Sequence, residues 1–112
     1  MGAGGWAKYR IMFRILKITG DSMYPRYQHG DFVLIRKTPI SFTNYHRGDV
    51  IVFEHALYGT LIKKIDQIDG ENKKVFVIAE HEDGLDSRQL GWIDMKCIIG
   101  KVIHDIRSKP SV

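Results

Sequence analysis

One cysteine, three prolines and the absence of any long apolar run set the first limits on this chain of 112 residues. Cys97, being alone, excludes an intramolecular disulfide and the usual zinc-ribbon patterns, and it fits a reducing compartment. A membrane-spanning helix needs about 20 apolar residues, whereas Lys8, Arg10, Arg14 and Lys17 interrupt the N-terminal stretch. We therefore expect a soluble, cytoplasmic protein without a signal peptide or spanning segment, which would associate with a membrane only through a partner.

The chain also has little excess of one charge. Its 17 basic and 13 acidic residues leave a formal net charge of +4, which permits an anionic partner without demanding one. A hydrophobic fraction of 44% and a charged fraction of 27% are those of an ordinary globular protein. Since a typical domain has about 150 residues, we expect a single domain over residues 1–112, with residues 1–9 flexible.

Glycine, in contrast, is plentiful. Eleven glycines mark turns between short runs rich in β-branched and aromatic residues, and such runs predict strands. No stretch keeps an apolar stripe of helical period long enough for a substantial helix. The segment 69–72 (Asp-Gly-Glu-Asn) is typical of a hairpin turn, and residues 38–47 read as a surface connection. The pattern predicts a mainly β fold, compact, antiparallel and partly closed like a barrel, with strands at 10–18, 31–37, 49–55, 60–68, 74–80 and 95–106.

The residues around Ser22 suit a nucleophile. Ser22 follows the turn residues Gly20 and Asp21 and precedes Met23 and the stiff Pro25, which predicts a tight, preorganised bend. A serine hydroxyl is inert at neutral pH until a base takes its proton. Histidine is the usual base in such sites, but a desolvated lysine also serves.

Two lysines stand side by side within an expected strand. Because successive strand residues point to opposite faces, one of Lys63 and Lys64 faces inward and the other faces solvent. Burial disfavours the ammonium form and lowers the pKa of the inner lysine. To act as a general base, that lysine needs a pKa lowered from about 10.4 to roughly 7–8.

The remaining polar residues are interpreted as structural. Asp86 and Arg88, two positions apart in an extended segment, are suited to clamping a loop by charge-assisted hydrogen bonds. Cys97 lies in an apolar run and is expected to be a buried core thiol. No metal site and no cofactor are expected, because the histidines lack the spacing of metal ligands; they are His29, His46, His55, His81 and His104.

Five segments together resemble the conserved boxes of type I signal peptidases, of the self-cleaving LexA-type repressors and of the maturation proteases of nickel superoxide dismutase. The resemblance covers residues 18–103, and its strength lies in the order and spacing of the boxes. In chain order they are Ser22-Met23-Tyr24-Pro25, Gly30-Asp31-Phe32-Val33, Gly48-Asp49-Val50-Ile51-Val52-Phe53, Ile62-Lys63-Lys64 and Asp86-Ser87-Arg88-Gln89-Leu90-Gly91.

This resemblance implies a LexA/signal-peptidase type of fold and a serine endopeptidase with a Ser/Lys dyad. Ser22 matches the nucleophile, its backbone N–H the oxyanion donor, and Lys63 the general base, with Lys64 as its exposed neighbour. Asp86 and Arg88 match a supporting ion pair. The implied substrate is an extended peptide, such as the leader of one partner protein, with small side chains near the scissile bond.

The sequence also departs from the family pattern. Some members carry a hydroxyl side chain two residues before the nucleophile, where this chain has Gly20. Many have a serine that assists the lysine, at the position of Gly84 here, and a threonine at the position of Arg26. The Gly-Asp-Asn stretch before the last box is replaced by residues 79–82 (Ala-Glu-His-Glu). The two dyad residues themselves are retained.

Two other functions remain open from the sequence. A small basic β-barrel can be a non-catalytic binding module, although an RNA-binding pattern of aromatic and basic residues on the strands is lacking, so nucleic acid is not expected. A self-cleaving repressor-type domain is the other alternative, because Ala3-Gly4 is the kind of pair that such proteins cut.

Overall fold

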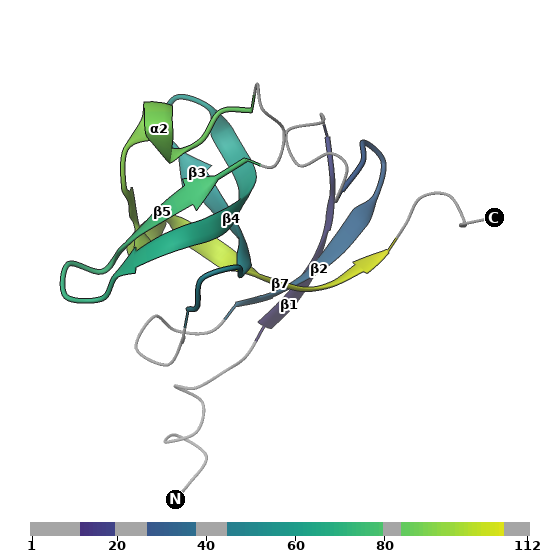
Figure 1. Cartoon of the computed structure of the whole chain (residues 1–112). Coiled ribbons are helices and arrows are strands. Elements are labelled where there is room, and N and C mark those ends of the chain that lie inside the picture. Colours follow the sequence, from purple (N-terminus) through teal and green to yellow (C-terminus); the bar gives the residue numbers. More distant parts are fainter. Residues whose placement is uncertain (1–11, 20–26, 38–44, 80–83, 107–112) are drawn as a thin grey trace, which may run out of the picture.

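The computed structural model describes residues 12–19, 27–37, 45–79 and 84–106. In this part of the chain, seven strands form one antiparallel sheet in the order β1-β2-β7-β3-β4-β5-β6. One helix, α2, and one 3-10 helix, η2, accompany them (Figure 1). The elements are β1 (Met12–Lys17), β2 (Phe32–Lys37), β3 (Val50–His55), β4 (Gly59–Asp69), β5 (Lys74–Ile78), α2 (Ser87–Leu90), β6 (Ile93–Asp94), η2 (Met95–Cys97) and β7 (Ile98–Ile106).

The expected mainly β, antiparallel fold is confirmed. Each of the six expected strands is present, and the hairpin turn over residues 69–72 joins β4 to β5, whose first pair is Asp69 with Lys74. The sheet curves but does not close, because β1 and β6 are its two edges. The strand expected at 95–106 begins later, at Ile98, since η2 occupies its first three residues.

Strand β3 is buried on both faces and separates two apolar cores. Its odd-numbered residues Ile51 and Phe53 enter a core with residues of β4, β5, β6 and β7. Its even-numbered residues Val50 and Val52 enter a second core with residues of β2. A strand buried on both sides explains why this run is continuously apolar and does not alternate.

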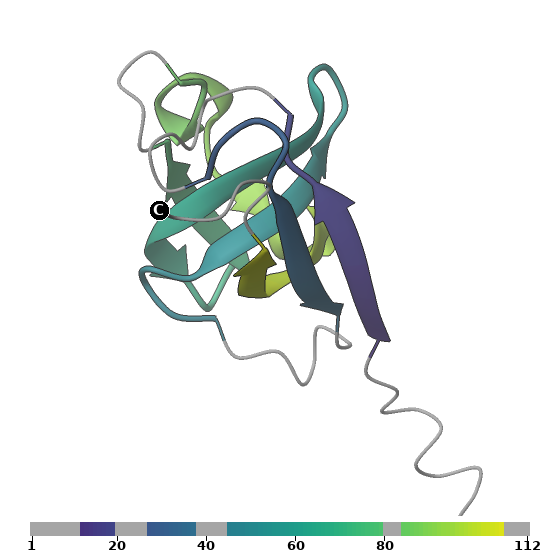
Figure 2. The same ribbon diagram turned by 90° about the vertical axis from the view of Figure 1, so that its right-hand side faces the viewer.

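The two cores correspond to two parts of the curved sheet. Figure 1 shows β4, β5 and α2 on one side of the molecule and β1 and β2 on the other, with β7 running from one part to the other. Turned by 90°, β1 and β2 are seen side by side (Figure 2), in agreement with their full antiparallel pairing. The long strand β7 pairs with both β2 and β3 and so joins the two parts.

Two expectations need correction. Cys97 is exposed, not a buried core thiol, because η2 turns the chain so that Met95 and Ile98 point inward on either side of it. Asp86 and Arg88 do not lie in an extended segment, since Asp86 caps the short helix α2, which contains Arg88.

Of the expected connection 38–47, only residues 45–47 lie in the described part. No helix among the described residues is long and apolar enough to cross a membrane.

Candidate active site

Lys63 lies in the middle of β4 and points into the first core. It pairs with Ile51 of β3, and directly opposite residues share a face of the sheet. Its side chain is 0% exposed. The Nζ atom has no hydrogen-bond partner among the described residues. An amine buried in this way is unusual, because buried polar groups are nearly always hydrogen-bonded.

Two opposing effects act on this amine. Burial lowers the pKa of Lys63, and the negative charge of Asp86 raises it in part, so that the pKa ends below its ordinary value of 10.5. The larger effect is the burial. A lysine with a lowered pKa has a larger fraction of free amine near neutral pH, which is the form that accepts a proton.

Lys64 lies on the opposite face of β4, as the alternation of strand residues requires. It pairs with Val50 on one side and with Ile78 of β5 on the other. Its side chain is half-buried. The sequence, in contrast, predicts a lysine exposed to solvent at this position. The inward position of this lysine pair therefore belongs to Lys63.

Asp86 is a buried carboxylate with a complete set of donors. It is 0% exposed. Its Oδ1 accepts hydrogen bonds from the backbone N–H and the Nε of Arg88, both at 3.0 Å. Its Oδ2 accepts from the Arg88 Nη2 at 3.0 Å and from the backbone N–H of Ala79 at 2.9 Å. Burial raises the pKa of Asp86, but the bonds from Arg88 and Ala79 outweigh it and hold the pKa below 3.8.

These contacts tie α2 to the end of β5, beside β4. Asp86 forms a capping box, in which its backbone N–H donates to the Gln89 side chain at 3.0 Å. The hydroxyl of Ser87 accepts a hydrogen bond from the backbone N–H of Val77 at 2.9 Å. The carboxylate that acts on Lys63 is thus held in place by Arg88 and Ala79. The Asp86–Arg88 ion pair forms across the start of a helix and not along the extended segment expected from the sequence.

Gly84 is at the position where many type I signal peptidases and LexA-type proteins carry a serine that assists the lysine. It is described and half-buried, and it has no side chain to offer the lysine. The neighbouring hydroxyl of Ser87 already accepts from Val77. The amine of Lys63 has no hydrogen-bond partner among the described residues, and the interaction found for it is with the charge of Asp86. Reasoning from the sequence missed this interaction.

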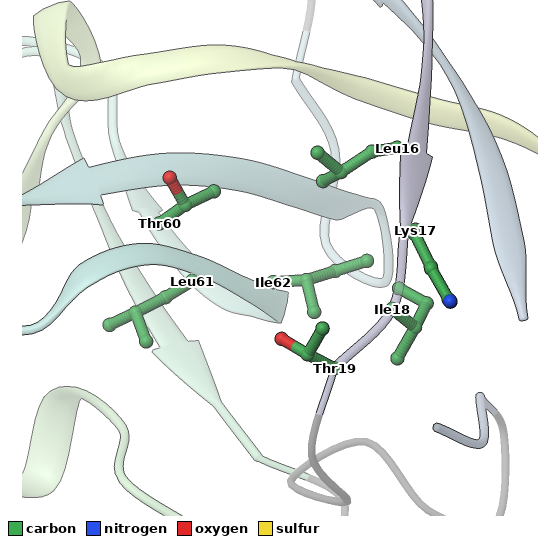
Figure 3. A pocket seen from close by; sticks show the side chains of 7 residues that line it. All are labelled: Leu16, Lys17, Ile18, Thr19, Thr60, Leu61 and Ile62. Atoms are coloured by element: carbon green, nitrogen blue, oxygen red, sulfur yellow. The ribbon is translucent and has the colours of Figure 1, made fainter. Parts of the chain in front are cut away.

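A pocket of about 180 Å³ is lined in part by the three residues of β4 that precede Lys63. One wall is the end of β1 and the residues after it, and the other is the beginning of β4 (Figure 3). Sequence reasoning did not find this pocket, although Leu61 and Ile62 directly precede Lys63 in the strand. Its lining residues are Leu16, Lys17, Ile18, Thr19, Thr60, Leu61 and Ile62.

The same half of β4 has an open edge. Residues 59–64 pair with β3 on one side, whereas pairing with β5 on the other side starts only at Lys64. The segment 59–63 therefore presents unpaired backbone groups with respect to the described strands. An extended peptide can add to such an edge as a further strand.

Several predicted positions lie outside the described residues: Ser22 with its backbone N–H, Gly20, Arg26 and the pair Ala3-Gly4. Thr19, three residues before Ser22, lines the pocket. No group of three or more histidine, cysteine, aspartate or glutamate side chains gathers as metal ligands in the described part.

The chain is similar in sequence to known peptidases. The family model of Peptidase S24-like proteins matches residues 9–103. Signal peptidase I V of Bacillus subtilis (strain 168) is 34% identical over 58 residues, which are 52% of this chain. The aligned part amounts to 34% of that protein's length.

Proposed function

Because the chain belongs to the Peptidase S24-like family, we propose that it is a serine endopeptidase with Ser22 as the nucleophile and Lys63 as the general base. The observation that carries the proposal is the amine of Lys63, which is fully buried and without a hydrogen-bond partner among the described residues. Buried ionisable groups with shifted pKa values are concentrated at functional sites.

The position of Ser22 along the chain supports the pairing. Ser22 lies three positions after Thr19, a lining residue of the pocket that also includes Ile62, the neighbour of Lys63 in β4. Three residues span at most about 11 Å. The backbone between Thr19 and Ser22 is therefore short enough for the proposed nucleophile to meet an extended peptide added to the open edge of β4.

In the proposed reaction, the Ser22 oxygen attacks the scissile carbonyl while the neutral Lys63 amine takes the hydroxyl proton. The backbone N–H of Ser22 donates a hydrogen bond to the oxyanion. Lys63 then gives the proton to the leaving amine, and an acyl-enzyme ester remains on Ser22. Lys63 next takes a proton from a water molecule, whose oxygen attacks the ester carbonyl. The ester bond to Ser22 breaks, and Lys63 returns the proton to the Ser22 oxygen, which restores both groups.

The open edge of β4 supports the substrate class that the family resemblance implies. We propose that the substrate is the extended leader of a partner protein, bound as an added strand. The family resemblance implies small side chains near the scissile bond, and the pocket of about 180 Å³ has room for these and for larger ones. A cytoplasmic location, with any membrane contact made through a partner, remains part of the same proposal.

The proposal is tested by mixing the protein with leader-bearing candidate proteins and measuring cleavage by intact mass. We expect Ser22→Ala and Lys63→Ala each to lower the rate by at least about a hundredfold, as the loss of a nucleophile or general base does. Lys64→Ala is the matched control and should keep most activity, because Lys64 lies on the other face of β4. Cleavage that survives both dyad substitutions would show that the dyad is wrong.

A further inference from the structure

The turn between β3 and β4 exposes two large apolar side chains. Leu57 is 75% exposed and Tyr58 is 50% exposed. Gly59, which has a positive φ of 75°, closes the turn and begins β4. The chain then runs through Thr60–Ile62, which line the pocket, to Lys63.

This turn is held in one conformation. The Nδ1 atom of His55 accepts hydrogen bonds from the backbone N–H groups of Leu57 at 3.1 Å and of Tyr58 at 3.3 Å. The ring of His55 also contacts the ring of Tyr58, with 5.2 Å between centroids. At the second pair of strand residues below the turn, the Thr60 hydroxyl donates to the Glu54 carboxylate. The two apolar side chains are therefore presented to solvent by a preorganised turn, which lowers the entropy lost when they bind.

The turn also lies at one end of the open edge of β4. A peptide strand beside residues 59–63 advances about 3.3 Å per residue. When the scissile bond is level with Lys63, the peptide residue level with Gly59 is four positions away. Peptide residues about four to six positions from the scissile bond then meet the side chains of Leu57 and Tyr58.

We propose that Leu57 and Tyr58 form a distal substrate-binding contact that selects an apolar side chain four to six residues from the scissile bond. This inference rests on the proposed function, because it needs a peptide on the edge of β4 with its cleaved bond near Lys63. The occupant is the substrate itself, because Leu57 and Tyr58 directly precede the strand segment 59–62, which belongs to the open edge and supplies residues 60–62 of the pocket lining. The proposed contact predicts a substrate with a small residue at the scissile bond and an apolar residue four to six positions away.

The test measures binding and cleavage separately. Fluorescein-labelled hexadecapeptides carry alanine at the central bond and either leucine or serine at one position, three to seven residues away on either side. Binding to the Ser22→Ala protein is followed by fluorescence anisotropy, so that no cleavage is required. We expect leucine at one position, four to six residues to one side of the bond, to tighten binding about five- to tenfold over serine.

The double variant Leu57→Ser/Tyr58→Ser, in the same Ser22→Ala background, should reduce this preference to less than twofold while the serine peptides bind as before. Ile68→Ser is the matched control, because Ile68 is a 36% exposed side chain at the far end of the same strand. It should leave the preference intact. Equal binding of leucine and serine peptides, no binding of any peptide, or a preference that persists in the double variant would overturn the inference.

Cleavage by the protein with Ser22 present separates the two proposals. If the leucine preference is found but no peptide is cut, the dyad is wrong and the binding contact stands. If cleavage requires Ser22 and Lys63 but shows no leucine preference, the dyad stands and the distal contact is wrong.

Discussion

At the scale of the single residue, Lys63 lowers the stability of the fold while it supplies the amine needed for the proposed function. Burying an amine without a hydrogen-bond partner is unfavourable, whether it stays charged or gives up its proton. Asp86 recovers part of this loss by its negative charge. An apolar side chain of similar length would fill the same space without that penalty, as happens when buried charged groups are replaced by well-packed hydrophobic ones.

Lys63→Met is therefore expected to stabilise the protein by about 1–3 kcal/mol at pH 7, with loss of the proposed activity. The comparison uses urea unfolding at several pH values. Lys64→Met is the control and should change the free energy of unfolding by less than about 0.5 kcal/mol, since that side chain is half-buried on the other face.

The gain should depend on pH in a definite direction. The folded pKa of Lys63 is lowered, so between that pKa and about 10.4 the unfolded chain binds more protons than the folded one. The stability of the wild-type protein therefore rises with pH in this window, and the advantage of Lys63→Met shrinks toward pH 10. A variant that is less stable than the wild type at pH 7 would contradict this account.

At the scale of elements, β7 passes very close to β2. Gly100 of β7 lies between two irregularities in strand pairing, one toward β2 and one toward β3. A Cβ atom at Gly100 would lie only 2.9 Å from the backbone oxygen of Arg36. The two strands can pass this closely only because residue 100 has no side chain. This glycine is therefore needed for the space that it leaves and not for its backbone angles.

Gly100→Ala is expected to destabilise the protein by about 1–3 kcal/mol, because the backbone of β2 must shift to make room. Gly70→Ala is the matched control, since a Cβ there has nothing within 4 Å. The two are compared by thermal and urea unfolding. Equal stability of both variants would show that the strands separate without cost.

The strands were predictable from the sequence because each is a run of β-branched and aromatic residues between turn residues. β6 was not, since the two residues Ile93 and Asp94 are too few to form a pattern. Helix α2 was missed although its capping box is visible in the sequence as Asp86 followed three residues later by Gln89. The exposure of Cys97 depends on the turn of η2, which an apolar run does not reveal.

The candidate site was predictable only in part. Alternation along β4 indicates that one of Lys63 and Lys64 faces inward, but the resemblance to known peptidases was needed to choose between them. The field of Asp86 on Lys63 and the pocket beside Ile62 arise from pairing between distant segments. No local pattern contains that information.

At the scale of the whole molecule, the curved sheet leaves one face of β1 and β2 uncovered by the described residues. Phe13 is 58% exposed and Ile15 is 62% exposed. They pair with Arg36 and Leu34 of β2 and so share one face with them. The opposite face of β2 carries buried residues of the second core. The strand β1 is therefore held mainly by its pairing with β2 and little by burial of its own side chains.

Phe13→Gln combined with Ile15→Gln is accordingly expected to change the free energy of unfolding by less than about 1 kcal/mol, because side chains that remain exposed contribute little to folding. The same change should shorten retention on a hydrophobic-interaction column, since it removes two neighbouring apolar groups from the surface. Val33→Ala, on the buried face of β2, is the contrast and should destabilise by about 1–3 kcal/mol. A loss of stability in the double variant as large as that of Val33→Ala would mean that this face is covered in the folded protein, and the outer face of β1 would then belong to the core.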